Sequence, residues 1–291
     1  MNKVNAVMVG GLFDENGISA FARPVLFGTA GDAMRDELPD AVEACFFAHD
    51  DRESAVAGAQ DIALDAANRF ASLAALPESE HVLVLAAPFA LAEEDALFHL
   101  AETHLNTGYG VSVLSAEQQG FDAEGQPLPR DSRCYAAMFT WDMLKKALAS
   151  GADTLDGLVA AVAAGAQKGI AITNKIYVIC DGTAAFMAQV EMMQRVNYGL
   201  IKKGVQIFDL TSTYIAPDAD IAPGATILPG CHIRPGCKVG AGAVIGPNTI
   251  LEKAEIGAGT TVNNSQVYES TVGSNTTVGP FAYIRPQSVV G

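Results

Sequence analysis

An aliphatic residue returns every five or six positions from Ile215 to the end of the chain, and this period constrains the fold more than any other feature. Ten of the thirteen intervals are six residues long and three are five. An α-helix would repeat at about 3.6 residues and a flat strand at about two, so the pattern predicts neither. The residues that carry it are Ile215, Ile221, Ile227, Ile233, Val239, Ile245, Leu251, Ile256, Val262, Val267, Val272, Val278, Ile284 and Val290.

Short fixed repeats of this kind are typical of a solenoid in which each hexapeptide supplies one short strand and one turn. The leading aliphatic side chain then enters a narrow core at every step. Gly, Pro or Asn follows in most hexads, where the backbone must turn, and small residues such as Ala225, Cys231 and Thr249 occupy the fifth position. We therefore predict a parallel β-helix, in which the five-residue steps require a local adjustment of a corner.

Length and charge restrict the rest of the chain. With 291 residues it exceeds the usual size of a single hydrophobic core, which favours two domains. Residues 207–291 hold four basic and six acidic side chains, so about −13 of the net charge of −15 lies in residues 1–206. Because an acidic domain repels phosphate backbones, we expect no nucleic-acid partner, and a small phosphorylated ligand would need local basic residues.

The location of the protein is also constrained by its sequence. No apolar run approaches the roughly 18 residues of a membrane helix, so we expect no membrane partner. The opening MNKVNAVMVGG lacks the features of a signal peptide, which favours the cytoplasm. The five cysteines form no CxxC pair, and we interpret them as reduced packing residues: Cys45, Cys134, Cys180, Cys231 and Cys237.

Strand-like and helix-like segments alternate in the first two thirds of the chain, which predicts a mainly parallel sheet covered by helices. Strands are expected at 4–11, 81–88, 110–117, 134–140 and 175–180, and helices at 62–76, 93–108, 141–151 and 154–168. Gly108 is expected to end the second of these helices. The predicted organisation is an α/β domain at 1–182, a connector helix at 183–206, and an incomplete β-helix of about four coils at 207–291.

Several segments resemble a known family. QRVNYGLIKKGVQIFDLTSTYIAPDADI, IGPNTIL and VGPFAYIRP are similar to segments of the bacterial bifunctional UDP-N-acetylglucosamine pyrophosphorylase/glucosamine-1-phosphate N-acetyltransferase family. PVLFGTAGDAM, VLVLAAPFAL and YAAMFTWDMLKKAL add a weaker, collinear likeness. The resemblance implies a Rossmann-like nucleotidyltransferase (GT-A-like) domain followed by a left-handed parallel β-helix. It also implies a homotrimer assembled through the β-helix, and a nucleotide or sugar-phosphate ligand.

The nucleotide site that the resemblance implies is altered in this chain. Family members hold the triphosphate with an LAAGxGTRM loop, and here the corresponding run is VGGLFDENGISAFARPV. Gly10 and Gly11 persist at the strand end and are candidate phosphate-binding residues, and Arg23 is the candidate replacement for a phosphate-binding lysine. Asp14 lies in the loop and would repel a triphosphate. The alternative interpretation of the glycines and Arg23 is a tight turn and a surface cation.

The implied magnesium site is altered as well. The family's metal-binding aspartate lies in VLVLxGDVPL, whereas VLVLAAPFAL places Pro88 there, and proline has no side-chain oxygen to bind Mg²⁺. Asp181 in CDGTAAF is the candidate for the second ligand. The alternative is that Asp181 or Thr183 caps the connector helix. Mg²⁺ is therefore expected as a cofactor only if uridylyl transfer persists.

In the coils, Arg285 of VGPFAYIRPQ coincides with an arginine that holds the sugar phosphate in the family, and Gln287 replaces the usual glycine. The family's remaining acetyltransferase residues lie in later coils, and this chain stops at Gly291, so we expect no acetyltransferase site here. His232 is expected to be a solvated corner residue. The apolar end at Val290 favours a chain that continues further or stacks on a partner.

Three readings of the function remain. The first is a sugar-nucleotide pathway protein of this family whose uridylyl transfer is lost or weakened. The second is an active UTP-dependent N-acetylglucosamine-1-phosphate uridylyltransferase that uses substitutes such as Arg23 and Asp181. The third is a non-catalytic trimeric scaffold or regulatory subunit.

Overall fold

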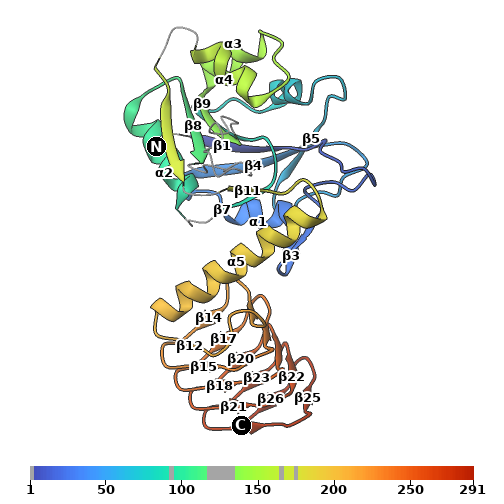
Figure 1. The fold of residues 1–291 in the computed structure, drawn as a ribbon, viewed down its shortest axis with the longest axis vertical. Coiled ribbons are helices and arrows are strands. Elements are labelled where there is room, and N and C mark those ends of the chain that lie inside the picture. Colours follow the sequence, from blue (N-terminus) through green and yellow to red (C-terminus); the bar gives the residue numbers. More distant parts are fainter. Residues whose placement is uncertain (1–2, 92–94, 117–134, 164–166, 174–175) are drawn as a thin grey trace, which may run out of the picture. The chain divides into compact units, whose positions relative to one another are not determined.

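The computed structural model describes residues 3–91, 95–116, 135–163, 167–173 and 176–291 (Figure 1). The chain divides into two compact units, Met1–Gln189 and Val190–Gly291. The helix α5 (Gly182–Lys202) runs across this division and covers most of the connector helix expected at 183–206.

A seven-stranded sheet with the strand order β10-β8-β9-β6-β1-β4-β5 forms the centre of the first unit. All neighbouring strands are parallel except β9, which runs antiparallel to both β6 and β8, so the prediction of a mainly parallel sheet is confirmed. The strands are β1 (Val4–Val9), β4 (Val42–His49), β5 (Gln60–Ala63), β6 (His81–Leu85), β8 (Val111–Ala116), β9 (Ala136–Thr140) and β10 (Gly169–Thr173).

Both faces of this sheet are covered. Alternate residues of the central strand β1 point in opposite directions, so they contribute to two separate cores. Ala6 and Met8 belong to a core that includes residues of α1 (Ala30–Asp36) and α2 (Ala96–Thr107). Val7 and Val9 belong to a second core. That core includes residues of the 3₁₀ helix η1 (Arg69–Ala75), α3 (Trp141–Leu148) and α4 (Leu155–Ala163). Two small sheets complete the unit: β2 (Pro24–Val25) with β3 (Gly28–Thr29), and β7 (Phe89–Leu91) with β11 (Ile176–Val178).

The prediction of an α-helix at 62–76 is wrong. The segment begins with the end of β5 and continues into the 3₁₀ helix η1. Asp65 accepts hydrogen bonds from the N–H groups of Ala67 and Asn68, and Asn68 accepts one from Phe70, so local side chains compete for backbone donors that an α-helix would use.

The expected elements differ from the structure elsewhere too. β4 and β10 were not anticipated, whereas the helix end at Gly108 is confirmed, since Gly108 takes a left-handed φ of 66° at the cap of α2. Parts of the expected elements at 93–94, 117, 134, 164–166 and 175 lie outside the described residues.

The second unit contains three parallel five-stranded sheets, and the predicted left-handed parallel β-helix is confirmed. The sheets are β12-β15-β18-β21-β24, β13-β16-β19-β22-β25 and β14-β17-β20-β23-β26. The strands are β12 (Gln206–Ile207), β13 (Tyr214–Ile215), β14 (Asp220–Ile221), β15 (Thr226–Ile227), β16 (His232–Ile233), β17 (Lys238–Val239), β18 (Val244–Ile245), β19 (Ile250–Glu252), β20 (Glu255–Ile256), β21 (Thr261–Val262), β22 (Gln266–Tyr268), β23 (Thr271–Val272), β24 (Thr277–Val278), β25 (Tyr283–Ile284) and β26 (Val289–Val290).

The periodic aliphatic residues line the interior of the coils as predicted. Ile215, Ile245 and Val272 are completely buried, and the same core takes in Ala225 and Cys231 from the fifth positions. Each strand bonds to the strand one coil away, for example Ile227 to Ile245, so every coil is held mainly by its two neighbours.

Each corner from Ile221 onward contains a residue with a positive φ at a set place, and this explains how the five-residue steps fit. In six-residue steps that residue lies three positions after the leading aliphatic; in five-residue steps it lies two positions after it. The six-residue corners use Gly224, Gly230, Gly236, Gly242, Asn248, Gly259, Asn275, Phe281 and Gln287, and the five-residue corners use Lys253, Asn264 and Glu269. The turn therefore keeps its left-handed residue and loses one residue before it.

Among the described residues, no helix is long and apolar enough to cross a lipid bilayer.

Candidate functional site

The candidate phosphate-binding glycines lie where β1 ends. The N–H of Gly10 donates to the carbonyl of Ala48 at 2.8 Å, which continues the pairing of β1 with β4. Gly11 has a left-handed φ of 81°, a conformation that favours glycine. A Cβ built on Gly10 would lie 2.3 Å from an oxygen of Glu53, so a larger residue would displace that side chain. The same Cβ would lie 2.8 Å from the backbone carbonyl of Ala48, so Gly10 accommodates both the carboxylate of Glu53 and the neighbouring strand.

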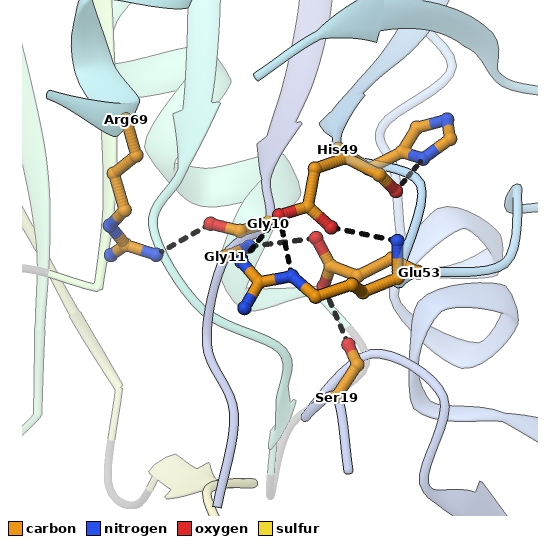
Figure 2. Close-up of polar contacts among 8 residues, drawn as sticks. Gly10, Gly11, Ser19, His49, Glu53 and Arg69 are labelled. Atoms are coloured by element: carbon orange, nitrogen blue, oxygen red, sulfur yellow. Dashed lines mark hydrogen bonds and ion pairs between the residues drawn. The ribbon is translucent and has the colours of Figure 1, made fainter. Parts of the chain in front are cut away.

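Glu53 is a buried carboxylate, only 6% exposed, on the loop between β4 and β5. Its N–H donates to the carbonyl of Asp50 at 3.0 Å, and this tight turn directs the side chain inward. Its carboxylate accepts the N–H of Gly11 at 2.8 Å and the hydroxyl of Ser19 at 2.5 Å. Figure 2 shows both contacts as dashed lines that end on the carboxylate of Glu53. Glu53 therefore fastens the loop after β1 to the loop after β4.

Arg69 is the first residue of η1, and its guanidinium reaches the end of β1, where it donates to backbone carbonyls. The acceptors are Val9 at 3.2 Å, Gly10 at 3.0 Å and Ala86 at 2.7 Å. Burial lowers the pKa of Arg69 below its ordinary value, and the negative charge of Glu53 opposes that shift. The side chain remains a cation, as arginine does in proteins, and it holds the ends of β1 and β6 together.

Arg23, the candidate for the phosphate-binding lysine, forms an ion pair with Asp14, and both side chains are largely buried. Asp14 also accepts the N–H groups of Asn16 and Ile18, so its carboxylate organises the loop. A Cβ on Gly182 would lie 3.5 Å from a terminal nitrogen of Arg23, which brings this arginine close to the start of α5. The structure thus associates Gly11 and Arg23 with two different carboxylates.

A third arginine near the loop is engaged as well. Arg52 pairs with Asp50 through two nitrogens, at 2.9 and 2.5 Å, and its guanidinium lies 4.3 Å from the ring centre of Phe13. The hydrogen bond from Arg52 lowers the pKa of Asp50. The described cations around the loop, Arg23, Arg52 and Arg69, therefore all have carboxylate or carbonyl partners already.

The two positions implied for magnesium are occupied by a proline and a capping aspartate. The carbonyl of Pro88 accepts the N–H of Ile179 at 2.9 Å. Asp181 is exposed, and its side chain accepts the N–H of Ala184 at 2.8 Å in the first turn of α5. Mg²⁺ needs several oxygen ligands in a near-octahedral arrangement. One carboxylate engaged in capping a helix does not fit that requirement.

In the coils, the side chain of Arg285 is exposed, and its carbonyl accepts the hydroxyls of Ser270 at 2.6 Å and Ser288 at 2.7 Å. His232, expected to be solvated, is instead partly buried and stacks on Tyr214 with the ring centres 5.1 Å apart. Burial lowers the pKa of His232.

Glu53 and Arg69 were missed by sequence reasoning. Glu53 lies in the acidic run DDRES, which reads as a solvated loop, and Arg69 lies in the segment expected to be helical. The contact of Glu53 with Gly11 joins residues 42 positions apart. The two successive glycines after β1 indicated a site at this strand end, but they did not identify Glu53 as the residue that contacts them.

The comparisons with known proteins concern mainly the second unit. Residues 210–291 match the family model described as the GMPPB C-terminal domain. The bifunctional protein GlmU of Clostridium acetobutylicum is 40% identical over 100 residues, which is 34% of this chain and 22% of that protein. GlmU of Halalkalibacterium halodurans is 38% identical over 110 residues, or 38% of this chain and 24% of that protein. The resemblance predicted from the coils is thus confirmed there, and the chain spans under a quarter of these relatives' length.

Two cytidylyltransferase structures resemble the chain at a lower level. The 2-C-methyl-D-erythritol 4-phosphate cytidylyltransferase of Thermus thermophilus has a TM-score of 0.47 and 18% identity, covering 64% of this chain and 97% of that one. The 4-diphosphocytidyl-2C-methyl-D-erythritol synthase of Anaerococcus prevotii has a TM-score of 0.47 and 14% identity, covering 66% of this chain and 98% of that one. These values are too low to support an inference about function.

Proposed function

We propose that this chain is a nucleotidyltransferase-like protein of the amino-sugar precursor pathway in which uridylyl transfer from UTP is lost or weakened. The observation that carries the proposal is the contact between Glu53 and the N–H of Gly11. In a phosphate-binding loop, backbone N–H groups must be free to meet the ligand. Here one such donor is bound to a buried carboxylate of the protein itself.

The charges around the loop support the same proposal. Phosphoryl transfer depends on cations that stabilise the charge of the phosphates. Asp14 neutralises Arg23, while Arg69 is engaged with three carbonyls. A triphosphate in this loop would meet Glu53 and Asp14 with few free cations to offset them.

We propose no Mg²⁺ in the first unit, since Pro88 and Asp181 offer a poor set of oxygen ligands.

One observation favours the second hypothesis, that of an active uridylyltransferase. The Nε of Arg23 is buried without a hydrogen-bond partner among the described residues. In that reading Arg23 would leave Asp14 to bind a phosphate, Asp181 would leave its cap to bind Mg²⁺, and Arg285 would remain a candidate for a sugar phosphate.

We also propose that the coils assemble as a homotrimer and serve as a scaffold or regulatory subunit. Large exposed apolar side chains on the last coils support an assembly surface, because an interface would remove their apolar area from water. Phe281 is 82%, Tyr283 59% and Val289 84% exposed.

We place the protein in the cytoplasm, in keeping with the free cysteines among the described residues, namely Cys45, Cys180, Cys231 and Cys237. Cys134 lies outside the described residues.

The test is a titration of UTP and Mg²⁺ followed by thermal unfolding, together with an assay for UDP-N-acetylglucosamine formed from UTP and N-acetylglucosamine 1-phosphate. A bound ligand raises the melting temperature by mass action. We expect no shift and little or no product. A rise of several degrees at millimolar UTP, or product formed at the turnover of about 1–10³ per second that is typical of enzymes, would refute the loss or weakening of activity. Light scattering that gives the mass of one chain would refute the trimer.

A further inference from the structure

The carboxylate of Glu53 is held in the manner of a bound anion. It receives one backbone N–H and one hydroxyl, at 2.8 and 2.5 Å, and is almost completely removed from solvent. Burying a carboxylate is costly unless hydrogen bonds and nearby positive charge compensate for the lost water. The surrounding donors, Gly11 and Ser19, therefore form a small oxyanion-binding pocket that the protein fills with its own side chain (Figure 2).

The backbone around the pocket is arranged for this anion. Gly10 leaves open the space that the Glu53 carboxylate fills, since a Cβ there would meet its oxygen at 2.3 Å. Gly11 takes a positive φ, and its N–H donates to that oxygen. Ser19 is itself buried and also accepts the N–H of Phe21 at 3.2 Å, so its hydroxyl hydrogen is directed at Glu53. Other contacts also hold these segments: the N–H of Gly10 donates to the carbonyl of Ala48, and the N–H of Phe21 donates to the hydroxyl oxygen of Ser19.

Positive charge stays near the pocket too. The guanidinium of Arg69 donates to the carbonyl of Gly10 at 3.0 Å, beside the residue whose N–H binds Glu53, and the negative charge of Glu53 opposes the lowering of the Arg69 pKa by burial. Its position, however, is fixed by the carbonyls of Val9, Gly10 and Ala86. Removing the Glu53 carboxylate would leave the guanidinium where it is, without its counter-charge. The pocket would then be empty and positively biased.

We propose that Glu53 is an intramolecular ligand of an oxyanion pocket and that, by filling it, Glu53 determines that the first unit rejects external carboxylates and phosphates. The inference rests on the proposed function, because it names the residue responsible for the lost nucleotide site. It assigns Gly10 and Gly11 a role in holding an internal anion.

The direct test is Glu53→Ala in the full chain, since the atoms lost correspond to acetate. We expect the variant to be destabilised and acetate to restore it, raising the melting temperature by about 2–4 °C relative to chloride at equal ionic strength. Inorganic phosphate is the second probe and is expected to act in the same direction. If the variant is unfolded without anions, recovery of its circular dichroism in acetate is the corresponding readout.

Two matched variants separate the pocket from general charge effects. Glu53→Gln keeps the side chain in the pocket without its charge, so acetate should have no effect on it. Asp51→Asn removes a charge from an exposed neighbour on the same loop and should behave like the wild type. An equal response to acetate in either variant, or no response to acetate in Glu53→Ala, would overturn the proposal.

This outcome can be told apart from a failure of the proposed function. Uridylyl transfer by the wild type would refute the loss of activity, whatever acetate does to Glu53→Ala. Conversely, an inactive wild type combined with an unresponsive Glu53→Ala variant would leave the loss of activity standing and exclude Glu53 as the residue that fills the site.

Discussion

Acidification is expected to destabilise the first unit through a buried pair of histidines. His104 on α2 is 1% exposed. Its two ring nitrogens face the Nδ1 of His81 and the hydroxyl of Ser112, each at 3.1 Å. Only one proton fits between the two imidazoles, so both rings cannot be charged while this contact persists. Burial, with a further contribution from His81, lowers the pKa of His104 from 6.5 to about 4.

The magnitude follows from linkage between protonation and folding. Because the folded pKa lies below the unfolded one, the stability is complete above pH 6.5 and declines as the pH falls towards 4. The fall of the pKa from 6.5 to about 4 corresponds to a loss of about 3 kcal/mol of folding stability at the acid end, of which about 2 kcal/mol is lost by pH 5. Burial also lowers the pKa of His81, which acts in the same direction.

The assay is urea unfolding between pH 7.5 and 4.5, comparing the wild type with His104→Gln. The variant is expected to be less stable at neutral pH because it disturbs the packing, but its stability should decline less on acidification. His99→Gln, on the exposed side of the same helix, is the matched control and should keep the wild-type pH profile. A stability difference between wild type and His104→Gln that is constant across this pH range would refute the reasoning.

Other substitutions test separate parts of the structure. Gln287→Gly should raise the melting temperature of the coils, since Gln287 has a φ of 65° that costs a non-glycine residue about 1 kcal/mol; an unchanged melting temperature would contradict this. Arg69→Met should cost about 2–4 kcal/mol in denaturant unfolding, because buried carbonyls lose their donors; a neutral result would exclude the proposed role of Arg69 in holding the ends of β1 and β6 together. Leu251→Ala should lower the free energy of unfolding by about 2–5 kcal/mol and accelerate hydrogen exchange mainly in the adjoining coils. Equal acceleration in all coils would contradict the view that each coil is stabilised mainly by its neighbours.

The coils were predictable because their determinants are local and repeated. The leading aliphatic residue of each hexad marks a buried position, and the repeat of the hexads predicts which strands pair between neighbouring coils. What the sequence did not reveal is how the corners at Lys253, Asn264 and Glu269 accommodate one residue fewer. None of these residues is glycine, so the usual marker of a left-handed turn is missing there.

The candidate site was less predictable because its contacts join distant segments. The glycines after β1 and the ion-pairing residue Arg23 could be located, but their partners could not. An acidic loop residue such as Glu53 is solvated in most proteins, whereas here the parallel pairing of β1 with β4 places the loops after the two strands side by side and brings Glu53 to Gly11. The acidic composition of the loop predicts that it repels a triphosphate. The structure adds that Glu53 already occupies the N–H of Gly11 and that Asp14 already pairs with Arg23.

The position of the left-handed residue within each corner also bears on how such coils change over evolutionary time. A strand cannot lose a residue without turning a core side chain outward, but a corner can lose one codon if its left-handed residue moves one step earlier. Indels are therefore expected to accumulate at corners, and the number of residues per coil can drift while the interior keeps its order. Sequence searches that demand a rigid spacing would overlook relatives of this solenoid whose coils have drifted in this way.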